Sequence, residues 1–235
     1  MKYFLIVIAI ILSFSGVSTA QEFQKKYFVI LNSNPNKPEL PKTEVDKIQA
    51  AHMANIDSLA KAGTLLAAGP FNGGGGLFVI VATSIENAQK VINTDPAVKA
   101  NRFVVELYPL TMNYGSVCPV KGKYEMVEYQ FILYKPVKEM IALEEKDKPE
   151  KLAKRHLRFL KETGFPVKYI AEGDFGADAG GFLIIEKTVE ENMSKLLKYD
   201  PWVKSGCFVS ELKILWIAKG SFCEQVDSNN LNKPH

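Results

Sequence analysis

The sequence predicts an α+β protein in which one β-α-β-β-α-β unit occurs twice and the two units pack sheet to sheet. The first observation is a repeat of about 105 residues: His52 and His156 lie 104 positions apart, and Asp95 and Asp200 lie 105 apart. The second is that each copy has four short apolar runs and two segments of helical periodicity, in the same order. A fixed period of this length indicates that each copy is one folding unit.

In the first copy, runs of apolar, β-branched and aromatic residues predict strands at 27–31, 64–68, 77–82 and 103–110. Apolar residues at helical spacing predict a first helix from about Thr43, which Gly63 stops. A second helix is expected from about Thr83 to Asn93, and Asp95-Pro96 ends it.

The second copy repeats this order with different residues. Its strands are expected at 129–134, 167–171, 182–185 and 208–217. Its first helix is expected at 149–163 before Gly164, and Asp200-Pro201 ends the second. Three helix starts are predicted from capping pairs: Thr43 with Asp46, Thr83 with Glu86, and Thr188 with Glu191.

The order β-α-β-β-α-β in about 90 residues is the ferredoxin-like arrangement, with both helices on one face of a four-stranded antiparallel sheet. The strands are apolar on both faces, as in Phe28-Val29-Ile30-Leu31, so the face without helices must also be covered. The other copy is the nearest cover. The sequence therefore predicts an intrachain pseudo-dimeric α/β barrel.

The first twenty residues differ from the rest of the chain. Lys2 is followed by an apolar run and by the small-residue exit Ser18-Thr19-Ala20, which is typical of a secretory signal peptide cleaved after Ala20. The predicted divisions are a signal peptide at 1–20, repeats at 21–110 and 124–217, a linker at 111–123 and a polar tail at 218–235. A periplasmic or extracellular protein, free of the membrane after cleavage, is expected.

Composition excludes several classes of function. The formal charge of +3 is spread among interspersed acidic and basic residues, which does not indicate nucleic-acid binding. The run Gly73-Gly74-Gly75-Gly76 precedes a strand rather than a helix, so no nucleotide cofactor is expected. One histidine per copy, without a Cys/His cluster, predicts no metal site. The expected partner is a small molecule, with no cofactor.

Cys118 and Cys223 are again 105 positions apart, each eight residues beyond an equivalent position in the last strand of its own copy, Leu110 or Leu215. Equivalent tails can meet near a pseudo-twofold axis, so a disulfide between these residues is one hypothesis, and two free thiols are the other. Cys207 is interpreted as a small buried apolar residue.

His52 and His156 are two of only three histidines in the chain, and each occupies the apolar stripe of its helix. One interpretation is a core histidine with a hydrogen-bond partner. The other is a functional imidazole, which the recurrence at equivalent positions favours.

Asp95 and Asp200 each precede a proline, a pattern typical of a helix N-cap. The alternative is that each carboxylate binds the histidine of its copy, fixes the tautomer and makes a general acid or base that works near neutral pH. The two roles are compatible.

These residues carry a family resemblance. His52, Leu65-Leu66-Ala67-Ala68-Gly69-Pro70, Asp95-Pro96 and Glu106-Leu107-Tyr108-Pro109-Leu110 resemble the YCII-related family of small dimeric α/β barrel proteins. The resemblance spans nearly all of the first copy. The second copy departs at the middle motif, where Glu172-Gly173-Asp174 replaces Ala-Gly-Pro.

The resemblance implies a histidine–aspartate pair in a largely apolar cleft, in a superfamily that includes dehydrochlorinases, lactone isomerases and monooxygenases. The resulting hypothesis is an exported, cofactor-independent acid/base enzyme of lyase or isomerase type. His52 with Asp95 and His156 with Asp200 are the expected catalytic pairs, and Gly69, Pro70, Gly173 and Asp174 the expected substrate-binding residues. The alternative is a non-catalytic module that binds a small ligand or is purely structural.

Overall fold

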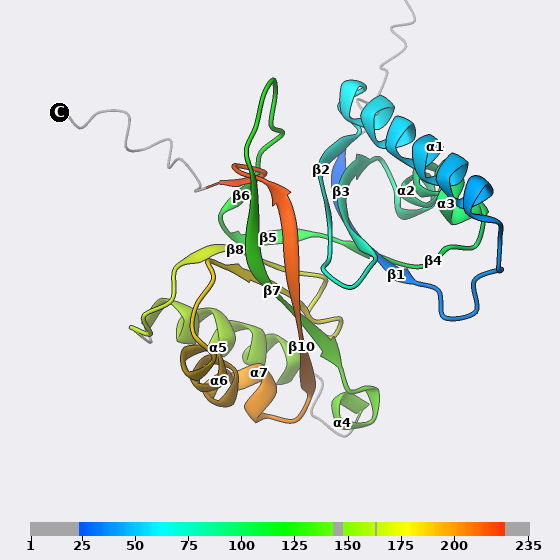
Figure 1. Cartoon of the computed structure of the whole chain (residues 1–235). Coiled ribbons are helices and arrows are strands. Elements are labelled where there is room, and N and C mark those ends of the chain that lie inside the picture. Colours follow the sequence, from blue (N-terminus) through cyan, green and yellow to red (C-terminus); the bar gives the residue numbers. More distant parts are fainter. Residues whose placement is uncertain (1–23, 143–147, 163, 224–235) are drawn as a thin grey trace, which may run out of the picture.

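The computed structural model describes residues 24–142, 148–162 and 164–223 (Figure 1). The predicted signal peptide and most of the predicted tail lie outside the described residues. Two antiparallel sheets form the frame of the protein, as the sequence predicts. No helix among the described residues has the length and apolarity needed to cross a membrane.

The first sheet has the strand order β2-β3-β1-β4. Its strands are β1 (Lys25–Ser33), β2 (Leu65–Pro70), β3 (Gly76–Ala82) and β4 (Phe103–Pro109). The helices of this copy are α1 (Lys42–Lys61), α2 (Ile85–Ile92) and α3 (Pro96–Lys99).

The second sheet has the order β10-β7-β9-β8-β5, so it repeats the first and adds one strand. Its strands are β5 (Thr111–Tyr114), β7 (Met126–Pro136), β8 (Tyr169–Asp174), β9 (Gly181–Ile185) and β10 (Phe208–Ala218). The helices are α4 (Lys138–Ala142), α5 (Lys148–Glu162), α6 (Glu190–Tyr199) and α7 (Pro201–Lys204). Helix α4 was not predicted.

Alternate residues of β1 contribute to two separate cores. Phe28 and Ile30 join a core shared by both sheets, whereas Val29 and Leu31 pack toward the helices of their own copy. In the shared core the rings of Phe28 and Phe182, from opposite sheets, have centroids 4.6 Å apart. This period of two explains why the strands are apolar on both faces. Figure 1 shows the helices of each copy gathered beside their own sheet.

Strands from one copy reach the edge of the other and close the barrel. Beyond β4, strand β5 pairs with β8 of the second copy. On the opposite side, Phe71 forms a β-bridge with Leu215, and Asn72 donates its backbone N–H to the Ile214 carbonyl at 2.8 Å. The predicted linker therefore contains regular structure, because its first residues complete the second sheet.

The two tails meet as the disulfide hypothesis requires. β6 (Ser116–Val117) pairs with β11 (Phe222–Cys223), and Cys118 and Cys223 form a disulfide with Cα atoms 6.0 Å apart. The bridge thus joins equivalent positions of the two copies. Cys207 is buried, as predicted, and takes no part in this disulfide.

The three predicted capping pairs were wrong. Helix α1 follows Pro41 and α6 follows Val189, both without a side-chain cap, and α2 is capped by Ser84. The threonine hydroxyls have other partners: Thr83 Oγ1 accepts a hydrogen bond from the Asn87 side chain at 2.7 Å. Thr188 Oγ1 accepts the equivalent bond from Asn192 at 3.1 Å.

Candidate functional site: two histidine–aspartate pairs

The first pair joins helix α1 to the start of α3. His52 Nδ1 lies 2.7 Å from Asp95 Oδ2. Because an ionised carboxylate only accepts hydrogen bonds, Nδ1 carries the hydrogen and Nε2 is left for other contacts. His52 is the buried residue of α1, at 8% exposure, and Asp95 is 1% exposed.

Asp95 has both of the roles considered from the sequence. Its Oδ1 accepts the backbone N–H of Ala97 at 2.8 Å, which caps α3, while Oδ2 accepts from the imidazole. A carboxylate has enough lone pairs for both. The cap therefore fixes the carboxylate, and the carboxylate fixes the histidine.

His52 borders a cavity of about 490 Å³ between α1 and the end of the first sheet. Most of its lining is apolar. The apolar lining includes Leu31, Ile56, Phe78 and Phe103 of the first copy and Met126 and Trp216 of the second. The first cavity is thus completed by strands of the other copy, as barrel closure requires.

The predicted substrate-binding residues Gly69 and Pro70 line this cavity. Gly69 also has a packing role, since a Cβ there would lie 2.6 Å from the Trp216 carbonyl oxygen. Only glycine lets β2 approach β10 this closely.

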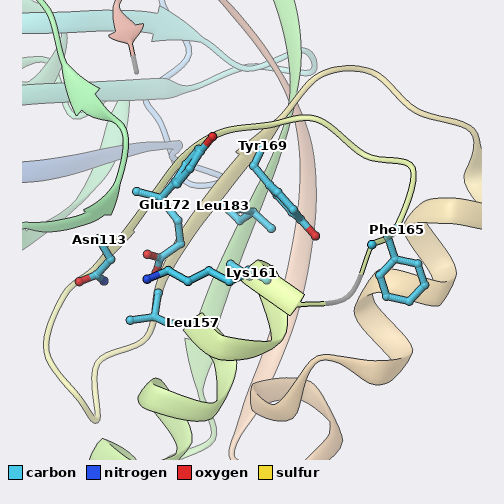
Figure 2. A pocket seen from close by; sticks show the side chains of 10 residues that line it. Asn113, Leu157, Lys161, Phe165, Tyr169, Glu172 and Leu183 are labelled. Atoms are coloured by element: carbon cyan, nitrogen blue, oxygen red, sulfur yellow. The ribbon is translucent and has the colours of Figure 1, made fainter. Parts of the chain in front are cut away.

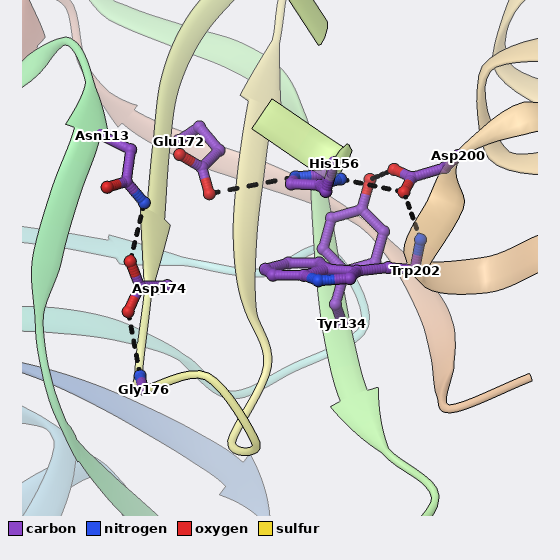
Figure 3. A network of polar contacts seen from close by, with 8 residues as sticks. All are labelled: Asn113, Tyr134, His156, Glu172, Asp174, Gly176, Asp200 and Trp202. Atoms are coloured by element: carbon purple, nitrogen blue, oxygen red, sulfur yellow. Dashed lines mark hydrogen bonds and ion pairs between the residues drawn. The ribbon is translucent and has the colours of Figure 1, made fainter. Parts of the chain in front are cut away.

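The second pair has the same core geometry within a denser environment (Figure 3). His156 Nδ1 lies 2.8 Å from Asp200 Oδ1, which also accepts the N–H of Trp202 at 2.9 Å. Tyr134 donates its hydroxyl to Asp200 Oδ2 at 2.8 Å. Burial, followed by the Asp200 charge, raises the pKa of Tyr134 well above its ordinary value, so the phenol stays protonated.

Trp202 encloses the second histidine. Its ring is parallel to the His156 imidazole with centroids 4.0 Å apart, and His156 is 0% exposed. The first copy has Ala97 at the equivalent position after the proline. His156 lines neither the cavity beside His52 nor a second cavity that lies beside Glu172.

Glu172 gives the second site a group that the first lacks. Strand pairing places it where the first copy has Ala68, because Glu172 faces Leu183 as Ala68 faces Phe78. Its Oε1 lies 3.9 Å from His156 Nε2 (Figure 3). Burial raises the pKa of Glu172 from 4.5 to about 8, although the nearby Asn113 amide opposes the shift.

A second cavity of about 360 Å³ lies beside Glu172 (Figure 2). It is lined mainly by α5 and β8, with Asn113 and Tyr114 of β5 as the contribution from the other copy. The predicted substrate-binding residues Gly173 and Asp174 are not part of this lining. A Cβ on Gly173 would lie 2.9 Å from the Thr111 carbonyl oxygen, so this glycine serves barrel closure, as Gly69 does.

Asp174 is occupied by structural contacts. Its Oδ2 accepts from Asn113 Nδ2 at 2.7 Å, and its Oδ1 accepts the backbone N–H of Gly176 at 3.0 Å. No group of three or more metal-ligating side chains occurs in the part of the chain that the structure describes.

Sequence reasoning missed the residues that one copy supplies to the other's cavity. Trp216 and Met126 reach the first cavity, and Asn113 reaches the second. A signal was available: Asn113 and Ala218 are 105 positions apart, and each lines the cavity of the opposite copy. The enclosing role of Trp202 carried no such signal.

Comparison with known proteins agrees with this architecture. Residues 26–111 match the model of the YCII-related domain. No curated protein matches the chain in sequence.

Solved structures of similar fold cover most of the chain. A mutant chlorite dismutase from Candidatus Nitrospira defluvii is 13% identical with a TM-score of 0.50, and the match covers 82% of this chain and 90% of that one. A second mutant of that enzyme, in complex with cyanide, is 12% identical with a TM-score of 0.49, over 84% and 92% of the two chains. A protein from Lactobacillus acidophilus NCFM, described only provisionally as a monooxygenase, is 11% identical with a TM-score of 0.41, over 86% and 99%.

At these identities the likeness concerns the fold alone, which hosts many unrelated functions. The chain therefore contains a YCII-related domain at residues 26–111 and has the duplicated α/β barrel architecture.

Proposed function

We propose that the first copy is an acid–base active site of lyase or isomerase type, acting on a small organic molecule with an apolar, ring-sized body. His52 moves the proton through Nε2, and Asp95 holds Nδ1. Asp95 is a positioning residue because it acts through the imidazole. The cavity between α1 and the sheet receives the substrate.

The observation that carries this proposal is the position of His52 at the wall of a largely apolar cavity of about 490 Å³, with one ring nitrogen bound to a buried carboxylate. Apolar cavities of this size with few polar groups are typical of small-molecule sites. A histidine oriented in this way is a common general acid or base near neutral pH.

For the second pair, one observation favours the alternative of a structural module. His156 is enclosed by Trp202 and Tyr134, so its hydrogen bond with Asp200 connects α5 to α7 without contact with a cavity. The second pair is accordingly assigned to folding, although the sequence alone predicts it as a second active site.

The same proposal places the mature protein in the periplasm or outside the cell. It rests on the signal-like sequence at 1–20 and is supported by the Cys118–Cys223 disulfide, since disulfides persist in oxidising compartments.

Carbon-bound proton exchange tests the acid–base role without knowledge of the natural substrate. The protein is incubated in D2O with a panel of unsaturated lactones and aromatic or chlorinated ring acids, and deuterium uptake is followed by NMR. We expect exchange in at least one member and a loss of roughly a hundredfold or more in His52→Gln.

Lys47→Ala is the matched control, because Lys47 is exposed on the same helix and does not line the cavity. It should keep most of the exchange rate. An unchanged rate in His52→Gln would show that the imidazole does not move the proton. Binding without exchange across the panel would favour a ligand-binding module.

A further inference from the structure

Glu172 is a buried carboxyl that the acid–base site does not use. It is 1% exposed, and neither of its side-chain oxygens has a hydrogen-bond partner among the described residues. The 3.9 Å between Oε1 and His156 Nε2 is too long for a hydrogen bond. Because an unpartnered buried polar group is costly, a partner from outside the chain would relieve this cost.

The surroundings of Glu172 can accommodate such a partner. Glu172 lines the second cavity, whose apolar walls include Leu157, Leu160, Phe165 and Leu183. Figure 2 shows the Lys161 side chain reaching from the end of α5 toward the Glu172 carboxyl. The first cavity has no equivalent carboxyl, since Ala68 occupies that position.

The charges around the second cavity favour an anion. Below about pH 8 the Glu172 carboxyl is neutral and can donate a hydrogen bond, and Lys161 adds a positive charge. Asp174 is engaged with Asn113 and Gly176. The remaining titratable groups nearby are Tyr114 on β5, Tyr169 on β8, and the His156–Asp200–Tyr134 cluster behind the cavity.

We propose that the second cavity is a separate binding site for a small organic acid with an apolar body. The carboxylate of the ligand accepts a hydrogen bond from the Glu172 carboxyl and pairs with the Lys161 ammonium, while its apolar part packs among Leu160, Phe165 and Leu183. A hydrogen bond from a carboxylic acid to a carboxylate is of the strong, charge-assisted kind. This site is independent of the proton transfer proposed for His52.

Calorimetric titration with benzoate tests the site, with benzyl alcohol and benzylamine as neutral and cationic probes of the same ring. Benzoate should bind tightest of the three at neutral pH. Lys161→Met and Glu172→Leu should each weaken benzoate by about tenfold, since both remove a partner of a charged group. Lys154→Met is the matched control on the same helix, exposed and outside the cavity, and should leave the affinity unchanged.

Glu172→Gln keeps a hydrogen-bond donor at this position but removes the group that can ionise. Its amide still donates, so benzoate should still bind at neutral pH. Above about pH 8, wild-type affinity should fall by up to about tenfold per pH unit as Glu172 ionises, whereas this variant should not show the fall.

Three results would overturn the assignment. One is tighter binding of benzylamine than of benzoate, with affinity that grows above pH 8. Another is benzoate binding that Lys161→Met and Glu172→Leu leave unchanged, which would place the ligand elsewhere. The third is no saturable binding of benzoate at millimolar concentration. Removal of a buried, unpartnered carboxyl does not threaten folding, so Glu172→Leu remains informative.

Discussion

His52 and His156 hold their aspartates at nearly equal distances, 2.7 and 2.8 Å, yet one imidazole borders a cavity and the other is enclosed. The surroundings differ at two equivalent positions. The first copy has Ala97 and Ala68 at these positions, whereas in the second copy Trp202 stacks on His156 and Glu172 lies 3.9 Å from its Nε2. The hydrogen-bonded pair therefore connects two helices in both copies. The neighbouring residues decide whether its imidazole borders a cavity.

The long helices α1 and α5 also differ in the residues that they bury. His52 is the buried residue of α1, whereas α5 buries both Leu152 and His156. The first helix thus leaves the larger cavity beneath it. The second copy has its remaining space farther along α5, beside Glu172.

Replacement of Trp202 should cause the largest loss of stability in the second copy. Trp202→Ala removes a ring at 1% exposure and should lower the free energy of unfolding by about 3–5 kcal/mol. Trp216→Ala is the matched control: it is the other tryptophan, 49% exposed at the first cavity, and should cost less than half as much. Urea denaturation measures both, and equal losses would contradict an enclosing role for Trp202.

Glu172 should give the second copy a pH-dependent stability. Its folded pKa of about 8 exceeds the ordinary 4.5, so the folded state holds a proton that the unfolded state releases. Stability should then fall as pH rises through this window, by roughly 2–3 kcal/mol from about pH 5 to about pH 7.

Glu172→Gln should lack this part of the slope, and Glu186→Gln, an exposed change beyond the neighbouring strand β9, should retain it. Chemical denaturation at several pH values gives the slopes. Parallel wild-type and Glu172→Gln curves would mean that Glu172 titrates normally in the folded state.

The smallest effect is expected at Tyr134. Tyr134→Phe removes one donor from Asp200, which keeps its bonds to His156 and to the Trp202 N–H, so a loss of about 1 kcal/mol is expected. Leu31 is the equivalent residue of the first copy and has no hydroxyl. Thermal or urea unfolding would reveal a loss of several kcal/mol if this hydroxyl were essential to the second pair.

Much of the fold could be predicted because the repeat reports long-range structure directly. Two copies with the same strand order and two apolar faces per strand leave sheet-to-sheet packing as the solution, and the equal spacing of Cys118 and Cys223 follows from the same symmetry. The helix starts could not be predicted in the same way. Thr83 and Thr188 can each bind a backbone N–H or an asparagine side chain one turn later, and local sequence does not decide between them.

The site was predictable only in part for a related reason. The Asp-Pro motif occurs in both copies, and its carboxylate both caps a helix and binds the histidine. The two roles are compatible because the two contacts use different lone pairs of the carboxylate. Whether an imidazole is accessible depends on the size of a neighbour such as Ala97 or Trp202. The sequence predicts only that this neighbour lies in a helix, not that it contacts the imidazole. Gly69 and Gly173 were predicted as substrate-binding residues, and the sequence could not show that both also permit the close approach of the two copies, because that contact is tertiary.

The covalent joining of the two units has a consequence for how such sites can change. In a symmetric dimer of identical chains, every substitution occurs in both active sites at once. Here Glu172 and Trp202 occur in one unit, while Ala68 and Ala97 occupy the equivalent positions of the other. A single chain with two units can therefore change the side chains beside one cavity without changing those beside the other.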